Sequence, residues 1–230
     1  MFDPGRREGI ARLRRDGSRW LSTSWDGGYR RADGVYNVTV PEGFDRTDLD
    51  AYREERLADV GFPSGPALLT GVEMRHARCA RNGPVTVLAT ASLSNPAALP
   101  MVDDGSSSGH SDAPDWRPGT VNLLVGVERA LDDGALATVL ATAVEAKAAT
   151  LLAVAGVPGT TSDAALVGCA PDAPTAAFAG SATEVGAAAR ACVRDAVRAS
   201  LAARYDDGPP TVAEAEYGVV TDRQTDVFQP

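Results

Sequence analysis

Side chains able to carry out acid–base or nucleophilic chemistry gather between residues 119 and 163. Glu145 and Lys147 lie in a long alanine-rich segment whose two ends are polar turns, one with Thr120 and Asn122 and one with Asp163. A partly buried glutamate could act as a general base, and a lysine as a general acid or as a donor to an oxyanion. Small and polar residues at both ends of a hydrophobic strand and helix are typical of the entrance to an active or binding site.

Glu145 and Lys147 are two residues apart, so on a helix they point to different sides and do not form one contacting pair. We expect at most one of them to face the chemistry directly. The other side chain would then be an ordinary charged residue that extends from the helix into solvent. Lys147 is also the single lysine of the chain, and the other basic residues counted with it are all arginines.

Threonine hydroxyls are the candidate nucleophiles if a covalent intermediate forms. Thr160 and Thr161 stand before Asp163 in a Gly-Thr-Thr-Ser-Asp turn, and Thr120 stands in the other polar turn. Asp163 has an ordinary alternative role, which is to close an Asx turn through its own side chain.

Thr183 and Glu184 open the last long helical segment. A threonine cap followed by a glutamate in the first turn is a common way to begin a helix. The same end of a helix also favours an amide oxygen or an anion. The pair is therefore a candidate for substrate binding as well as for capping.

Cysteine and histidine offer little to a metal site. The three cysteines, Cys79, Cys169 and Cys192, are far apart and lack a CxxC spacing, which disfavours both a disulfide framework and zinc. Cys169 and Cys192 are typical of small core residues. The two histidines, His76 and His110, cannot build a multi-histidine site, although His110 could close over a substrate as a lid. We predict no metal, and the sequence lacks the glycine-rich nucleotide-binding patterns.

The net charge of −9 and the isoelectric point of about 4.7 disfavour nucleic acid and anionic membranes as partners. An acidic surface with arginine in place of lysine is typical of a salt-loaded cytoplasm or a GC-rich genome, and suggests a halophilic archaeon. We find no apolar run close to the ~18 residues that span a bilayer, and residues 1–8 are too polar for a signal peptide. We expect a cytoplasmic protein.

The first half of the chain predicts mostly strands. Its expected elements are a short or frayed helix at residues 1–16, strands at 20–25 and 34–40, a helix at 46–60, and strands at 67–74 and 84–91. The first two strands could form one hairpin, and the Asn82-Gly83 pair favours a hairpin turn between the last two. Asp45 or Thr47 is expected to cap the helix.

The second half of the chain predicts a β-α-β-α order. Its expected elements are a buried strand at residues 121–127, a helix at 135–155, a strand at 164–169, a helix at 184–204 capped by Thr183 or Ser181, and a short strand at 217–221. Together the halves favour an α/β fold, a layered sandwich with a mixed β-sheet and a strand-rich N-terminal half. We expect one domain over residues 1–230, with a core at about 18–205, a mobile loop at 102–118 and a polar tail at 206–230.

Six polar motifs, taken in order over residues 20–205, resemble those of the adenosylcobinamide amidohydrolases, a family of corrinoid salvage. They are Leu21-Ser22-Thr23 with Gly27-Gly28 and Asn37, Thr90-Ala91 with Ser94-Asn95, Gly119-Thr120-Val121-Asn122, Glu145-Ala146-Lys147, Gly159-Thr160-Thr161-Ser162-Asp163, and Gly180-Ser181-Ala182-Thr183-Glu184-Val185-Gly186. One position departs from the pattern, because Val144 stands where the family usually has threonine. Thr142 could supply a hydroxyl instead, and we infer that the missing one is dispensable.

The resemblance implies amide hydrolysis, in which adenosylcobinamide yields adenosylcobyric acid and aminopropanol for cobalamin salvage. The substrate would be a small-molecule cobalt corrinoid, with no further cofactor, and the oligomeric state stays open. Such a reaction needs a nucleophile, stabilisation of the oxyanion and a proton for the leaving amine. We assign catalytic roles to Glu145, Lys147, Asp163 and Thr161, and substrate-binding roles to Ser22, Asn37, Asn95, Thr120, Asn122, Thr160, Thr183 and Glu184.

Two other functions stay open at this point. One is a different amide or peptide hydrolase with a threonine nucleophile on an αββα sandwich. The other is a non-catalytic corrinoid-binding or carrier protein, although the Asp-x-His-x-x-Gly spacing of some carriers is absent from the sequence. Trp20, Trp25, Tyr29 and Trp116 could contact a flat corrin ring, but ordinary core or rim packing is the simpler interpretation.

Overall fold

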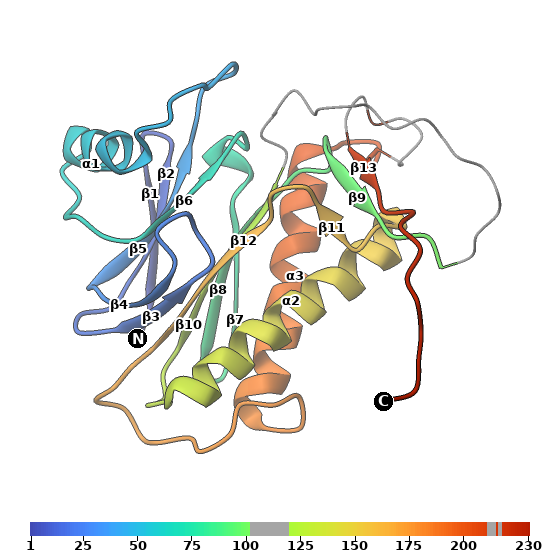
Figure 1. Cartoon of the computed structure of the whole chain (residues 1–230). Helices are drawn as coiled ribbons and strands as arrows, with labels where there is room; N and C mark the ends of the chain where they lie inside the picture. Colours follow the sequence, from blue (N-terminus) through green and yellow to red (C-terminus); the bar gives the residue numbers. More distant parts are fainter. Residues whose placement is uncertain (102–119, 211–214, 216–217) are drawn as a thin grey trace.

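The computed structural model describes residues 1–101, 120–210, 215 and 218–230, and in this part of the chain it shows three β-sheets and three α-helices (Figure 1). The elements are β1 (Asp3–Arg7), β2 (Ile10–Arg14), β3 (Arg19–Ser22), β4 (Gly28–Arg31), β5 (Gly34–Thr39), α1 (Leu49–Asp59), β6 (Ala67–Thr70), a 3-10 turn (Met74–His76), β7 (Arg78–Asn82), β8 (Val85–Ala91), β9 (Pro96–Ala98), β10 (Val121–Val127), α2 (Asp133–Ala155), β11 (Gly159–Thr160), β12 (Ala164–Cys169), α3 (Glu184–Arg204) and β13 (Val219–Val220).

The two larger sheets pack face to face, and helices cover their outer faces. The first sheet has the strand order β1-β2-β5-β6, and the second has the order β4-β3-β12-β10-β8-β7. Figure 1 shows α1 on the outer side of the first sheet and α2 with α3 on the outer side of the second. A small third sheet, β11-β9-β13, lies at the C-terminal end of α2. The predicted layered α/β sandwich is confirmed.

The second sheet is mixed, as predicted, because α2 joins the two parallel strands β10 and β12 while the neighbouring pairs in this sheet are antiparallel. A parallel pair needs such a long crossover. Along β10 the side chains of Val121, Leu123 and Val125 face the helices, and Leu124 faces the first sheet. Strand β10 is therefore buried on both sides, which explains its unbroken apolar sequence.

Two glycines set the contact between the large sheets. A side-chain carbon added at Gly126 would lie 2.3 Å from the ring of Phe2, and one added at Gly168 would lie 2.3 Å from the ring of Trp20. The two rings fill this space edge to face, with centroids 5.4 Å apart. Trp20 is fully buried, so the prediction of ordinary core packing is confirmed for this residue.

The two long helices begin and end as the sequence predicts. The Asp132 carboxylate accepts from the backbone N–H of Ala135 at 2.7 Å, and Gly156 ends α2 with a φ of 72°. Glycine adopts this left-handed conformation without the steric cost that a side chain brings. The Thr183 hydroxyl accepts from the N–H of Gly186 at 3.0 Å and caps α3.

Helix α2 is long and apolar enough, by length and composition, to cross a membrane. The expectation that no apolar segment reaches such a length is therefore wrong, because alanines extend the apolar stretch. Core helices of soluble proteins meet the same criterion, so the finding is weak evidence of a membrane. Residues along one side of α2 are buried against the second sheet and α3.

Two predictions for the N-terminal residues are wrong. Residues 1–16 form the hairpin of β1 and β2 rather than a helix, with a turn at Glu8 and Gly9, whose φ angles are 43° and 79°. Pairing of β2 with β5 satisfies backbone groups that a helix would have satisfied locally. Strand β3 does not pair with β5 either, since β3 lies between β4 and β12 in the other sheet.

Two further predictions need correction. The turn at Asn82-Gly83 does join a hairpin, but its strands are β7 and β8, while β6 pairs with β5 in the first sheet. Asp48 occupies the N-cap position of α1 without a side-chain capping bond, so neither Asp45 nor Thr47 caps this helix. The predicted loop at 102–118 and Tyr217 lie outside the described residues, and β13 covers only Val219–Val220.

Candidate active site

Asp163 lies in the polar turn between β11 and β12, where four groups of the described chain donate hydrogen bonds to its carboxylate. Oδ1 accepts from the backbone N–H of Val121 at 2.8 Å and from the Thr160 hydroxyl at 2.5 Å. Oδ2 accepts from the backbone N–H of Thr160 at 3.1 Å and from the ammonium of Lys147. One carboxylate thus joins the start of β10, the turn and the middle of α2.

Lys147 reaches this carboxylate from α2. Its side chain is 9% exposed and that of Asp163 is 14% exposed, so the two opposite charges form a nearly buried ion pair. Removing one member of such a pair is costly, because the remaining charge keeps its desolvation penalty without a partner. The chain's single lysine is therefore tied to this turn by electrostatics as well as by packing.

Gly159 makes the approach of these two groups possible. A side-chain carbon at this position would lie 2.7 Å from Asp163 Oδ2 and 2.9 Å from Lys147 Nζ. Any other residue would push the carboxylate and the ammonium out of their present positions. The glycine at the start of the turn is thus a steric requirement of the cluster.

The cluster opens into a cleft of about 420 Å³ between α2 and the edges of the sheets. The cleft is lined by Thr23, Ala97, Val121, Leu123, Val144, Lys147, Pro158, Gly159, Thr160, Thr161, Asp163, Ala164 and Ala165. The Thr160 hydroxyl therefore lies at a cavity wall with its proton directed at a carboxylate. This arrangement suits a hydroxyl nucleophile with an adjacent general base.

Thr161 and Asn95 stand at the same corner. Thr161 lines the cleft and is exposed, and its backbone N–H donates to the carbonyl of Asn95 at 3.1 Å. Asn95 itself is only 4% exposed. The structure thus brings Thr160, Thr161 and Asp163 together at the cleft and places Asn95 directly behind them.

Asn37 and Asn122, predicted to bind substrate, lie in a buried network between the two large sheets. Asn37 Nδ2 donates to the Thr90 hydroxyl at 2.8 Å, and Asn37 Oδ1 accepts from Asn122 Nδ2 at 2.9 Å. Asn122 Oδ1 accepts from the Thr120 hydroxyl at 2.7 Å, and Asn122 Nδ2 also donates to the Leu69 carbonyl at 2.9 Å.

None of these four polar side chains is more than 2% exposed. Their amide and hydroxyl groups bond to one another, as buried polar groups must. Thr120 and Asn122 flank Val121, whose N–H donates to Asp163. The structure therefore gives this network a positioning role for the start of β10 and does not place its members at the cleft wall.

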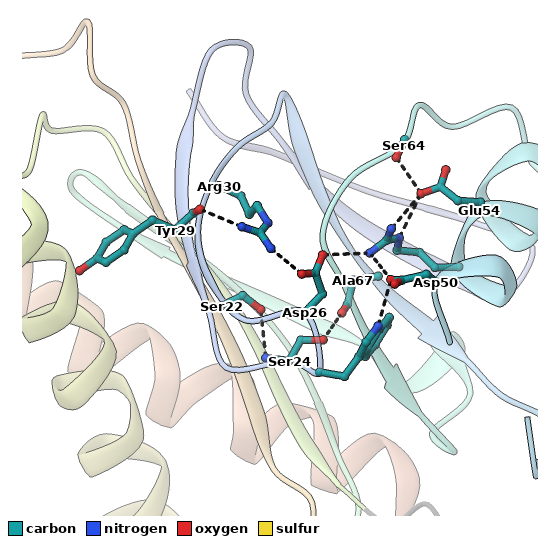
Figure 2. Close-up of polar contacts among 11 residues, drawn as sticks. Ser22, Ser24, Asp26, Tyr29, Arg30, Asp50, Glu54, Ser64 and Ala67 are labelled. Carbon is teal, nitrogen blue, oxygen red and sulfur yellow. Dashed lines mark hydrogen bonds and ion pairs between the residues drawn. The ribbon is translucent and has the colours of Figure 1, made fainter. Parts of the chain in front are cut away.

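Ser22 also has a structural contact. Its hydroxyl accepts from the backbone N–H of Ser24 at 3.0 Å, and Ser24 donates through its own hydroxyl to the carbonyl of Ala67 at 2.9 Å (Figure 2). Asp26 forms ion pairs with Arg30 and with Arg53 of α1. These contacts tie the loop after β3 to the neighbouring elements, and so hold Thr23, which lines the cleft.

The remaining predicted residues lie away from the cluster. Glu145 points to the other side of α2 and forms an ion pair with Arg190 at 2.7 Å, which confirms that it and Lys147 do not share a face. Glu184 pairs with Arg129 at 2.9 Å, beyond the far end of β10. The seven residues of β10 separate the start of α3 from the Asp163 cluster by about 20 Å, so Thr183 and Glu184 act there as cap and first turn.

Some residues of the cleft were missed from the sequence. Thr23 accepts from the N–H of Ala165 at 2.9 Å and lies at the cleft wall, although the motif Leu21-Ser22-Thr23 had drawn attention only to its neighbour. No sequence pattern predicts that the backbone N–H of Val121 donates to Asp163. Gly159 was recognisable as part of a Gly-Thr-Thr-Ser-Asp turn, but its steric role requires the position of Lys147.

The cysteines and His76 do not contribute to the cluster. His76 Nδ1 donates to the carbonyl of Ala203 at 2.8 Å, and His110 lies outside the described residues. Cys169 and Cys192 are buried, as predicted, and burial raises the pKa of Cys192 to about 11. Within the described ranges, no group of three or more His, Cys, Asp or Glu residues has the geometry to hold a metal ion.

Two other cavities are lined by different kinds of residues. One of about 500 Å³ lies beside Asp26, Arg30 and Arg53, whose charges pair with one another. The other, of about 580 Å³, runs between α2 and α3 and is flanked by Arg190 and Arg194. Neither combines a hydroxyl, a carboxylate and a buried ammonium as the cleft does.

Comparison with known proteins agrees with this chemistry. A family model described as adenosylcobinamide amidohydrolase matches residues 5–209. A protein of Halobacterium salinarum named adenosylcobinamide amidohydrolase is 54% identical over 233 residues, covering all of both chains. The chain is therefore an amidohydrolase, an enzyme that hydrolyses a linear amide bond. It belongs to the adenosylcobinamide amidohydrolase family, as the order of the polar motifs indicated.

Proposed function

We propose that this enzyme hydrolyses the amide that joins aminopropanol to the corrin of adenosylcobinamide, and that the reaction takes place at Thr160, Lys147 and Asp163. The observation that carries the site is the convergence of a threonine hydroxyl and a buried ammonium on one carboxylate at a cleft wall. The family and the related protein support the substrate.

The first half of the reaction uses Thr160 as the nucleophile. Asp163 Oδ1 takes the hydroxyl proton along the existing hydrogen bond, and Thr160 Oγ1 forms a bond to the carbonyl carbon of the amide. Lys147 stays protonated, and its charge stabilises the carboxylate and the developing oxyanion. The C–N bond then breaks, and the proton held by Asp163 passes to the leaving amine.

The second half restores the enzyme. Water attacks the ester that now joins the substrate to Thr160, and Asp163 takes a proton from this water. The bond to Thr160 Oγ1 breaks, and the proton passes back to the threonine oxygen. The net reaction adds one water to one amide and gives a carboxylic acid and an amine, adenosylcobyric acid and aminopropanol. The cobalt belongs to the substrate, and the proposal requires no separate cofactor.

The setting of the reaction is also part of the proposal. A chain with a net charge of −9 and a single lysine suits a salt-loaded cytoplasm. The acidic surface does not favour nucleic acid or anionic membranes, and the small-molecule corrinoid is the partner that the family name supports.

The test incubates the purified protein with adenosylcobinamide over a range of salt concentrations and separates the products by chromatography. We expect adenosylcobyric acid and aminopropanol in equal amounts. Absence of both at every salt concentration would refute the substrate. Full activity of an Asp163→Asn variant would refute the site while leaving the substrate in place.

The experiment also separates the two rival functions. A self-processed threonine hydrolase would show a cleaved chain by mass spectrometry, whereas the proposed mechanism uses Thr160 inside an intact chain. A corrinoid carrier would bind adenosylcobinamide without releasing aminopropanol.

A further inference from the structure

Strand β13 connects the C-terminal segment of the chain to the active site. In the small third sheet β9 lies between β13 and β11 (Figure 1), and β11 contains Thr160. Strand β13 runs parallel to β9, with Val219 opposite Ala97. The backbone N–H of Thr221 donates to the carbonyl of Ala98 at 3.0 Å. The C-terminal segment is thus one strand away from the proposed nucleophile.

The carboxylate and the hydroxyl of the cluster are held by different sheets. Asp163 is anchored to the second large sheet and to α2, through the N–H of Val121 and the ammonium of Lys147. The backbone of Thr160 pairs with Pro96 of β9, in the third sheet. The position of the hydroxyl at the cleft wall therefore depends on where β9 lies.

Strands β9 and β11 form a very short ribbon. Strand β11 has two residues and β9 has three. Strand β11 is an end strand of its sheet, so β9 is its one strand neighbour among the described residues. A ribbon of two strands is marginally stable by itself, and a third strand strengthens it. Pairing with β13 on the other edge of β9 therefore restricts the movement of the strand that lies opposite Thr160.

Burial of apolar side chains does not explain why β13 is held at this place. Val219 is 42% exposed, and within the described ranges neither it nor Val220 belongs to a hydrophobic core cluster. No described residue of the C-terminal segment lines the cleft. The strand also lies after residue 209, where the match to the family model ends. Backbone pairing with β9 is thus the contact through which β13 can act on the site.

Gly218 allows β13 to approach β9 closely. Its φ of 147° is rarely adopted by residues with a side chain, and an added side-chain carbon would lie 2.5 Å from the carbonyl oxygen of Pro96. A side chain there would force the two strands apart. Gly208 also has a positive φ, 90°, but an added carbon would meet no atom within 4 Å. The two glycines therefore differ in their contact with β9.

We propose that β13 is a positioning element of the active site and Gly218 a positioning residue. By pairing with β9, the strand holds the β9–β11 ribbon in place and keeps the Thr160 hydroxyl aligned with Asp163 and with the cleft. This inference rests on the proposed function, in which Thr160 is the nucleophile. A displacement of about 1 Å can cost about 10²-fold in rate, so release of β13 lowers kcat. It leaves KM nearly unchanged, because the strand does not contact the substrate.

The first test compares Gly218→Ala with Gly208→Ala in the full chain. We expect Gly218→Ala to lower kcat for adenosylcobinamide at least about tenfold and to change KM by less than about threefold. Gly208→Ala places a side chain at a positive φ without a contact with β9. It should therefore change both constants by less than about twofold.

A second pair of variants removes one hydrogen bond of β13. Thr221→Pro lacks the N–H that donates to Ala98, and the side chain of Thr221 is exposed. Thr225→Pro, the control, changes an exposed residue that lies outside β13. We expect Thr221→Pro to lower kcat at least about threefold, and Thr225→Pro to leave it within about twofold of the wild-type value.

Hydrogen–deuterium exchange of the peptide that covers residues 157–163 measures the coupling without turnover. Exchange should be at least about tenfold faster in Gly218→Ala than in the wild-type protein, and unchanged in Gly208→Ala. If the wild-type protein does not hydrolyse adenosylcobinamide while exchange still rises in Gly218→Ala, the proposed function is refuted and the coupling of β13 to β11 stands. Wild-type hydrolysis with an unchanged kcat in Gly218→Ala would overturn the positioning role and retain the function.

A strand that only covers the edge of the sheet gives a different result. Exposed strand edges promote aggregation. If light scattering shows larger species of Gly218→Ala while kcat per folded chain is unchanged, β13 merely protects the edge of β9 and the proposal is wrong. A melting temperature within about 3 °C of the wild-type value shows that a variant is folded. If Gly218→Ala does not fold, Thr221→Pro and its control decide the question.

Discussion

The ion pair between Lys147 and Asp163 gives the sharpest test of the site, because stability and activity should respond to it differently. In Asp163→Asn the Lys147 ammonium remains buried without its partner. We expect the free energy of unfolding to fall by about 3 kcal/mol, near the lower end of the cost for breaking a buried pair, since both side chains retain some contact with solvent.

The reverse variant should cost less. In Lys147→Met the Asp163 carboxylate keeps three donors, two of them backbone N–H groups and one the Thr160 hydroxyl. We therefore expect a loss of about 1–3 kcal/mol. The double variant removes both charges. In it the Thr160 N–H loses its acceptor, because the amide nitrogen of the new asparagine side chain replaces Asp163 Oδ2. The loss in the double variant should be about 1–2 kcal/mol, which is less than the sum of the two single losses.

Activity should not recover with stability. Each of the three variants lacks the general base, the ammonium or both, so each should lose at least about 10²-fold in kcat/KM. Urea unfolding followed by circular dichroism measures stability, and chromatography of the released adenosylcobyric acid measures activity. Additive stability losses would show that the two charges are not coupled, and an active double variant would show that the chemistry lies elsewhere.

Four further outcomes follow from the contacts of the site and its surroundings. Thr160→Val should fold normally by calorimetry and lose at least about 10³-fold in activity, and a fully active variant would remove Thr160 as the nucleophile. Gly159→Ala should lose about 1–3 kcal/mol in urea unfolding together with activity, because its methyl group would displace Asp163 and Lys147. Glu145→Gln should keep its activity within about twofold and change stability by less than about 1 kcal/mol, since its ion pair is exposed. Burial raises the pKa of Cys192 from 9.0 to about 11, so the buried thiol contributes stability below pH 9 that is lost as the pH rises to 11. The Cys192→Ala variant should remain active. In pH-dependent unfolding it should not show this loss of stability.

Much of the second half of the chain was predictable from local patterns. The boundaries of β10, α2, β12 and α3 follow from apolar periodicity and from caps at Asp132, Gly156 and Thr183, which act within a few residues of themselves. The N-terminal hairpin was not predictable in this way. Residues 1–16 become strands because they pair with β5 and bury Phe2 and Leu13 between the sheets, contacts that no local pattern contains.

The candidate site shows the same division. The sequence alone determined the reactive residue types, the order of the polar motifs, the family they indicate, and the fact that Glu145 and Lys147 cannot share a helix face. Only the tertiary structure decided that Lys147 and not Glu145 meets Asp163, that Thr160 holds the hydroxyl directed at it, and that Asn37 and Asn122 lie behind the site. The physical reason is distance along the chain. Two of the four bonds to Asp163 come from residues 16 and 42 positions away, and such contacts form only when α2 and β10 pack into one core.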